Sequence, residues 1–208
     1  MRESPKETII FSPTAVVQAT FTAATTDIIT SNAHGLSEGD CIWVSNSGGA
    51  LPAGLSASTN YYVRDVTTNT FKVSATPMGT AVDITGAGTG THTYNLKGKA
   101  IYTGDWAHNI IHLTFSSTPT MTIKVQGSII EATPDFNAAQ SITNQWDYIE
   151  VIDYQDGAAI DGDTGIACAG TADNRIFEVN VNGLTWVTVA ITAWTAGKLG
   201  IALKSYND

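Results

Sequence analysis

The stretch HGLSEGDCIWVSNSGGALPAGLSASTNYYV, residues 34–63, decides the fold of the N-terminal half of the chain. It alternates polar turns, a short apolar strand at residues 41–44, a Gly/Pro-rich loop and an aromatic strand. Short strands separated by such turns are typical of small β-barrels and sandwiches. His34, placed before Gly35, is expected to be a turn residue whose ring caps a backbone group. The stretch contains no obvious nucleophile with its base and no metal-ligand set.

The sequence around this stretch predicts a small β-barrel domain over residues 14–96. About six short strands fit into it, with a turn at each junction. Two of them, residues 60–66 and 70–74, flank a tight turn and predict a hairpin. Residues 1–13 carry mixed charge and two prolines. They are expected to form an N-terminal arm or an edge segment that docks on something, with disorder as the alternative.

The C-terminal part, residues 97–208, predicts an antiparallel β-sandwich of about eight strands, joined to the barrel near Asn95–Lys99. Its strongest local signal is Asn182–Gly183 between two alternating runs, which predicts a hairpin. Residues 147–153 alternate strictly and predict one strand, whereas residues 131–146 are polar and predict a long loop. The fold class is therefore all-β: a small β-barrel-like N-terminal domain plus an antiparallel β-sandwich C-terminal domain.

Charge and hydrophobicity exclude several classes of partner. The formal net charge is −9, and only 14% of residues are charged. Binding to nucleic acid or to an anionic membrane surface requires a basic face, so neither partner is expected. No run approaches the roughly 20 apolar residues of a membrane span, and the N-terminus lacks the apolar core of a signal peptide. We therefore expect synthesis in a cytosol.

The two cysteines, Cys41 and Cys168, lie far apart in apolar runs and match no metal-binding spacing. They are expected to be buried thiols without a disulfide. Asp161 and Asp163 are weak candidates for a calcium site, because the loop lacks a closing glutamate and turn chemistry alone explains its composition. No cofactor is expected.

Two further features have structural explanations. The glycines at 86, 88 and 90 resemble a phosphate loop, but strand-like residues follow them, so a hairpin turn is expected. His108 and His112 have the spacing of a helical metal pair, but this stretch predicts a strand, in which the two lie some 13 Å apart.

No arrangement typical of a catalytic site is visible, so the chain is predicted not to be an enzyme. Trp106 and Trp146 lie in polar loops and are the candidate binding residues of a contact surface, because a partly exposed indole offers both an apolar face and a polar N–H group. A host glycan is one partner that such a surface would suit.

Several motifs occur in one order: His34–Leu36, Gly39–Asp40, Ile42–Val44, Leu51–Leu55, Tyr61–Val63, Phe71–Ser74 and Gly86–Gly90. This series, over roughly residues 25–95, resembles a small β module of structural proteins of tailed phages. That module is similar in fold to the first catalytic-cysteine half-domain of ubiquitin-activating enzymes, without their activity. TMTIKVQGS and DNRIFEVNVNG, in residues 100–208, resemble phage-type β-sandwich domains.

The resemblance implies a structural component of a tailed-phage virion, either a capsid decoration or a neck or tail subunit. Its partners would be other virion proteins, it would form a homo-oligomer, and it would join the virion after synthesis in the host cytoplasm. The alternative is a carbohydrate-binding tail-fibre or adhesin module that recognises the host surface through Trp106 and Trp146. The chain is short and lacks coiled-coil heptads, which favours the compact structural part.

Overall fold

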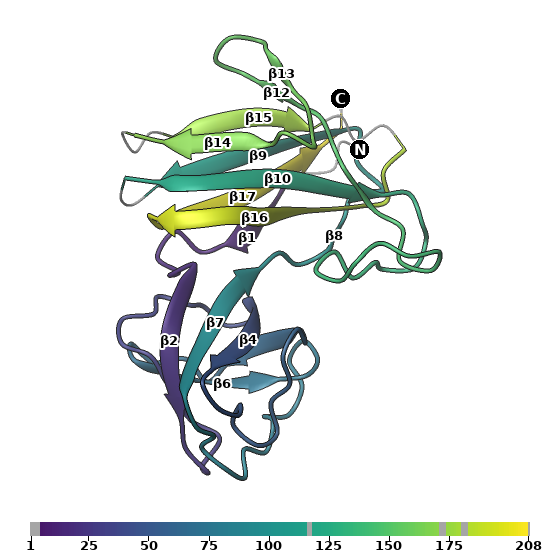
Figure 1. The fold of residues 1–208 in the computed structure, drawn as a ribbon. Helices are drawn as coiled ribbons and strands as arrows, with labels where there is room; N and C mark the ends of the chain where they lie inside the picture. Colours follow the sequence, from purple (N-terminus) through teal and green to yellow (C-terminus); the bar gives the residue numbers. More distant parts are fainter. Residues whose placement is uncertain (1–4, 116–117, 171–173, 180–182, 208) are drawn as a thin grey trace. The chain divides into compact units, whose positions relative to one another are not determined.

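The computed structural model describes residues 5–115, 118–170, 174–179 and 183–207. It confirms the predicted all-β class, with seventeen strands in the described ranges. The chain divides into two compact units (Figure 1). One is Thr14–Lys97, and the other combines Met1–Pro13 with Gly98–Asp208. The described part of the chain contains no helix of the length and hydrophobicity needed to cross a membrane.

Unit Thr14–Lys97 is a closed barrel in the order β2-β3-β6-β5-β4-β7. Its strands are β2 (Gln18–Ala23), β3 (Ile29–Thr30), β4 (Cys41–Ser47), β5 (Tyr61–Arg64), β6 (Thr70–Ser74) and β7 (Thr91–Lys97). Every neighbouring pair is antiparallel, and pairing of β2 with β7 closes the ring. Closure leaves no long unpaired edge, which suits a domain of such short strands.

The turn at the start of the opening stretch is built as its sequence predicts. The Nδ1 atom of His34 accepts the N–H of Leu36 at 3.0 Å, which confirms the predicted cap. The His34 ring is buried and lies edge-on to Phe71 at 5.0 Å, and Phe71 lies edge-on to Tyr94 at 5.9 Å. Burial lowers the pKa of His34, against the raising effect of the backbone of Thr70 and Thr67. A neutral ring therefore joins the aromatic core of the barrel.

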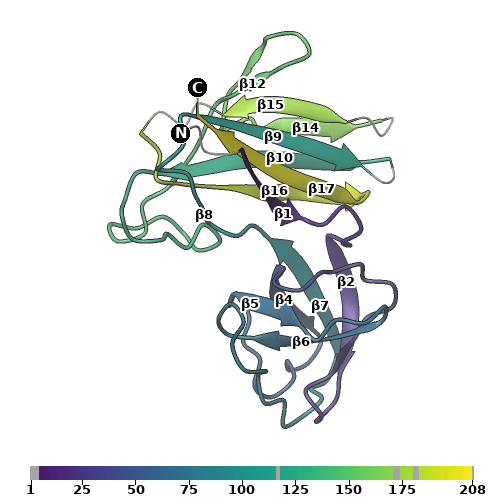
Figure 2. The same ribbon diagram turned by 180° about the vertical axis from the view of Figure 1, so that it is seen from behind.

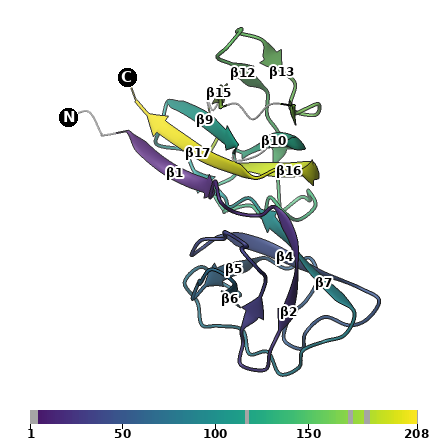
Figure 3. The same ribbon diagram turned by 90° about the vertical axis from the view of Figure 1, so that its left-hand side faces the viewer.

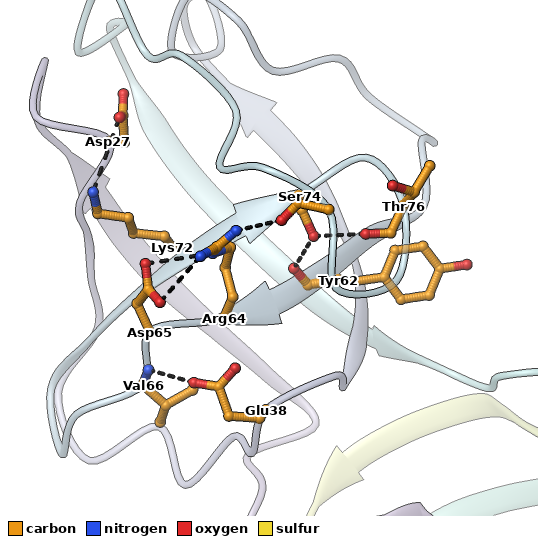
Figure 4. Close-up of polar contacts among 10 residues, drawn as sticks. Asp27, Glu38, Tyr62, Arg64, Asp65, Val66, Lys72, Ser74 and Thr76 are labelled. Atoms are coloured by element: carbon orange, nitrogen blue, oxygen red, sulfur yellow. Dashed lines mark hydrogen bonds and ion pairs between the residues drawn. The ribbon is translucent and has the colours of Figure 1, made fainter.

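The predicted hairpin of β5 and β6 is confirmed by their antiparallel register, in which Val63 faces Val73. Figure 4 shows the polar contacts around it. The Ser74 hydroxyl lies 3.3 Å from the Tyr62 carbonyl and 2.8 Å from that of Thr76. The Glu38 carboxylate accepts the N–H of Val66 at 2.9 Å, and this bond ties the hairpin to the turn that precedes β4.

Gly35 is the tightest point of the barrel, and it supplies a stability test. Its φ is +61°, and an added Cβ would lie 1.9 Å from the carbonyl oxygen of Thr14. Gly39 has a φ of +78° but open space around its Cβ position. We expect Gly35→Ala to destabilise the barrel by at least ~3 kcal/mol and Gly39→Ala by only ~1–2 kcal/mol, the cost of the left-handed backbone alone. Urea unfolding of both variants measures the difference, and equal losses would contradict the steric account.

The second unit is a sandwich of two antiparallel sheets with eleven strands, rather than the eight or so expected. The six-stranded sheet runs β1 (Lys6–Phe11), β17 (Leu199–Tyr206), β9 (His108–Phe115), β15 (Arg175–Val179), β12 (Val151–Asp153) and β13 (Ala159–Ile160). The five-stranded sheet runs β11 (Asp147–Tyr148), β10 (Thr120–Ser128), β16 (Trp186–Ala196) and β8 (Ile101–Tyr102), with β14 (Ile166–Ala169) also paired to β10. Figure 3 shows the two layers from the side.

The core of the sandwich follows from period-two alternation, which sends every second side chain inward. Along β9 and β10, buried and part-exposed residues alternate for most of their length. The inward, buried side chains of the two sheets are Ile111, Leu113, Phe177, Val179, Ile201, Leu203, Met121, Ile123, Val125, Val187 and Val189. Both cysteines are buried thiols, as predicted, with Cys41 in the barrel and Cys168 in the sandwich.

Two local expectations about the sandwich were wrong. The runs on either side of Asn182–Gly183 do not form a hairpin: β15 pairs with β9 and β12, whereas β16 pairs with β10 and β8. β15 and β16 therefore belong to different sheets; residues 180–182, which include Asn182, lie outside the described residues. Residues 147–153 form two strands instead of one, because β11 joins the five-stranded sheet and β12 the six-stranded sheet.

The N-terminal arm, expected over residues 1–13, is largely a strand of the sandwich. β1 pairs antiparallel with β17, with a register shift between Ile9 and Phe11. Ile10 is 0% exposed and Phe11 is 1% exposed, so the shift lets two consecutive side chains enter the core. The segment does dock at a sheet edge, and the partner is the last strand of its own chain.

This pairing predicts a contrast between neighbouring side chains of β1. Phe11→Ala would remove a fully buried ring and should cost about 3–5 kcal/mol of unfolding free energy. Ile9→Ala, two positions earlier, alters a side chain that is 48% exposed and should cost no more than ~1 kcal/mol. Urea unfolding measures both, and a tolerated Phe11→Ala would mean that β1 does not pack on the core.

Candidate functional site

Figure 2 shows the molecule from the side on which the six-stranded sheet lies. The face of this sheet that points away from the core carries a row of side chains, and we call it the outer face. The strand registers place Ile9, Ala202, His112 and Ile176 next to one another across four strands. The N–H of Tyr154 donates to the carbonyl of Ile176 at 3.0 Å and extends the row. Ile9, Ile176 and Tyr154 are 48%, 44% and 53% exposed. Large apolar groups are thus gathered on one accessible surface.

A second row runs parallel to the first and mixes charge with apolar groups. It contains Glu7, Lys204, Ile110, Glu178 and Ile152, each placed by the register of its strand with the next. Acidic and basic side chains alternate with isoleucines along it. Such a composition resembles a protein–protein interface, in which an apolar centre is bordered by polar groups that set the register.

An aromatic and ionisable cluster lies at one end of these rows. The ring of His108 stacks on that of Tyr206, with centroids 5.0 Å apart and planes 17° apart. The Nδ1 atom of His108 lies 4.0 Å from a carboxylate oxygen of Glu178. Burial raises the pKa of Tyr154, and Glu178 and Tyr206 act in the same direction. The two histidines of the 108/112 pair therefore lie on a strand, as predicted, and belong to this surface.

The sequence reasoning missed the outer face, although a signal for it exists. Consecutive apolar residues occur at Ile9–Ile10, Ile110–Ile111, Val151–Ile152 and Ile176–Phe177. In a strand one member of each such pair must point away from the core. Ile111, Val151 and Phe177 are buried, and their partners make up much of the outer face.

A buried ion pair holds the strands beneath this surface. The Asp153 carboxylate pairs with the guanidinium of Arg175 and also accepts the N–H of Gln155 at 2.9 Å. Arg175 lies over the Phe177 ring, 4.8 Å from its centroid. Burial alone would raise the pKa of Asp153, but the hydrogen bond from Gln155 and the interaction with Arg175 outweigh it and hold that pKa below its usual value. The pair fixes β12 to β15; Tyr154 directly follows β12, and Ile176 lies on β15.

The long loop that the sequence predicts covers the outer side of the five-stranded sheet around Gln126. The buried amide of Gln126 donates to the carbonyl of Phe136 at 3.0 Å, and Phe136 is itself buried. Trp146 packs against Phe136 and Tyr148, with centroids 6.3 Å and 5.3 Å away, and its indole N–H donates to Ala138 at 3.2 Å. Trp146 thus fixes this loop to the sheet, a structural role for a residue predicted to form a contact surface.

The other candidates are dispersed. Trp106 is part-exposed in a turn, where its backbone N–H donates to Thr103 at 3.0 Å. The Asp161 carboxylate accepts the N–H groups of Asp163 and Thr164 at 2.9 Å and 3.2 Å, so it serves the turn itself. Within the described ranges, no three His, Cys, Asp or Glu side chains gather as a metal site.

The fold and its surface define a two-unit all-β protein with an accessible, mixed apolar and charged sheet face. No protein-family model matches the chain, and neither does any curated protein. Two solved structures, both of phage-derived proteins, are similar to it. The SPBc2 prophage-derived protein YomS has 15% identity and a TM-score of 0.37, over 53% of this chain and 80% of that one. The PBSX exported protein XepA has 7% identity and a TM-score of 0.39, over 98% of this chain and 82% of that one. At these TM-scores the likeness establishes neither a shared fold nor a shared function, and the resemblance to the ubiquitin-activating half-domain stays a prediction.

The Asp153–Arg175 pair predicts a pH-dependent contribution to stability. Because the folded pKa of Asp153 lies below its ordinary value of 3.8, its contribution is complete above that value and disappears as the pH falls through the folded pKa. Asp153→Asn should therefore lower the melting temperature at pH 7, and the gap from the wild type should narrow below about pH 4. Thermal unfolding from pH 7 to pH 2 measures this gap. Asp163→Asn, at an exposed site, serves as the control and should change stability at pH 7 by no more than ~0.5 kcal/mol. A gap that stays constant with pH would exclude the pair as its source.

Proposed function

We propose that the chain is a non-enzymatic structural component of a tailed-phage virion, a capsid decoration or a neck or tail subunit, that binds neighbouring virion subunits through its outer face. The observation that carries this proposal is the mainly apolar row that crosses four strands and continues to Tyr154, in which Ile9, Ile176 and Tyr154 are each about half exposed. A contiguous apolar surface rimmed by polar groups marks an interaction site in a soluble protein.

The charged row supports contacts with protein in particular. Glu7, Glu178 and Lys204 place both signs of charge beside isoleucines. Surfaces of this kind orient a protein partner, whereas the formal net charge of −9 disfavours nucleic acid. The proposal names a virion because the ordered series of motifs resembles a β module of phage structural proteins. Synthesis in the host cytoplasm followed by incorporation into the particle is part of it.

The outer face also suits a homo-oligomer. A sheet face packed against a copy of itself, or against a neighbour in a ring, buries isoleucines and can match Glu178 of one subunit with Lys204 of the next. Burying such a face would add to the stability of each subunit at the concentration reached during assembly.

Substitution of the apolar row tests the proposal. Ile9→Glu combined with Ile176→Glu places two charges where a partner would bury apolar groups, and it should reduce incorporation into particles at least tenfold. Mass spectrometry of particles purified from the encoding phage gives the number of chains per particle. Sedimentation of the purified chain shows whether self-association falls in parallel.

The matched control is Ile142→Glu, which changes an isoleucine that is 89% exposed on the loop of the other sheet. It should leave incorporation unchanged, and all variants should keep the wild-type melting temperature within a few degrees. Normal incorporation of the double variant, or equal loss with the control, would remove the outer face from the proposal.

A further inference from the structure

A groove with a volume of about 860 Å³ lies beside β2 of the barrel. Its walls come from residues 19–23, 30–32 and 87–92. β2 pairs with β7 through Gln18–Phe21 but with β3 only through Thr22–Ala23. β7 therefore flanks the first part of β2 and β3 flanks its end, and residues next to both strands complete the walls of the groove.

The glycine-rich wall of the groove is rigidly held. Thr89 and Ala50 exchange backbone and side-chain hydrogen bonds, from the N–H of Thr89 to the Ala50 carbonyl at 2.9 Å and from the N–H of Ala50 to the Thr89 hydroxyl at 3.2 Å. The Asn46 amide donates to the Thr89 carbonyl at 2.8 Å. An added Cβ at Gly88 would lie 2.6 Å from the carbonyl oxygen of Ala50, so only glycine permits this close packing.

His92 closes the base of this wall. Its Nδ1 atom lies 2.8 Å from the Asn46 amide nitrogen and its Nε2 atom 3.1 Å from the Ala87 carbonyl oxygen. A ring with its proton on Nε2 satisfies both contacts. The ring is buried and packs on Phe21 at 5.4 Å. The glycine run that the sequence analysis assigned to a turn is thus also a preorganised wall, which reduces the entropic cost of binding a ligand.

The lining combines apolar and polar surface. Lys, Arg, Asp and Glu are all absent from it, whereas hydroxyl groups are abundant. Thr22, Thr30, Thr89 and Thr91 are exposed along it. Hydroxyls both donate and accept hydrogen bonds, and they offer no counter-charge to a phosphate, a carboxylate or a cation. The volume lies within the roughly 300–1,000 Å³ of ligand sites.

We propose that this groove binds a neutral saccharide. Sugar hydroxyls match the donor and acceptor character of the threonines, and an uncharged ligand leaves no buried charge unpaired. The site is distinct from the tryptophans first considered for glycan contact, and it belongs to the barrel unit alone. It goes beyond the virion role and does not depend on the outer face.

The test uses the full chain and three defined probes: maltohexaose, cellohexaose and chitohexaose. We expect isothermal titration calorimetry to detect binding of at least one at millimolar concentration or tighter. Thr22→Val combined with Thr91→Val removes two hydroxyls with nearly constant shape and should weaken that binding about tenfold. Hexagalacturonate, an acidic counterpart, should bind at least tenfold more weakly than the best neutral probe.

Thr93→Val is the matched control, since Thr93 lies on β7 two positions from Thr91 and outside the groove lining. It should leave the affinity unchanged, and thermal unfolding confirms that each variant is folded. Binding of none of the neutral probes at 10 mM (about the weakest affinity the method resolves), binding that the double variant leaves intact, or equal affinity for hexagalacturonate would each overturn the proposal.

Discussion

The pairing of β1 with β17 is the constraint on which the sandwich depends. It joins residues near the start of the chain to residues near its end and seats Ile10 and Phe11 in the core. The barrel, Thr14–Lys97, is therefore an insertion between the first and second strands of the sandwich in chain order. Contacts between residues so far apart in sequence form late in folding, because closing the long loop between them costs conformational entropy before the contact stabilises the chain.

Local chemistry made much of the fold predictable. Turn residues and alternation were enough for the all-β class, the barrel, the β5–β6 hairpin and the His34 cap, because each rests on neighbours in sequence. The same rules failed at Asn182–Gly183 and at residues 147–153. An Asn-Gly turn specifies a reversal of the chain, but which sheet receives the next strand is decided by long-range packing. Apolar and polar residues likewise alternate through residues 147–153, although β11 and β12 belong to different sheets. Alternation therefore cannot reveal where one strand ends and the next begins.

The candidate surfaces were less predictable because exposure depends on what covers a face. Trp146 stands in a polar loop, a context that suggests contact with a partner, yet it packs between Phe136 and Tyr148 and fixes that loop to the five-stranded sheet. Ile9 and Ile176 lie in apolar strands, a context that suggests a position in the core, yet both side chains are about half exposed. The two sheets of the sandwich thus differ in their outer sides: Gln126 and Thr188 are buried on one, whereas isoleucines remain accessible on the other.

The row on the outer face draws its members from residues 9, 112, 176 and 202, each on a different strand. The row is continuous only when β17 is in place, because Ala202 on β17 lies between Ile9 and His112. The surface therefore forms only once β17 has paired with both β1 and β9. Copies truncated before β17 would retain the barrel residues, Thr14–Lys97, but would lack the interface proposed above.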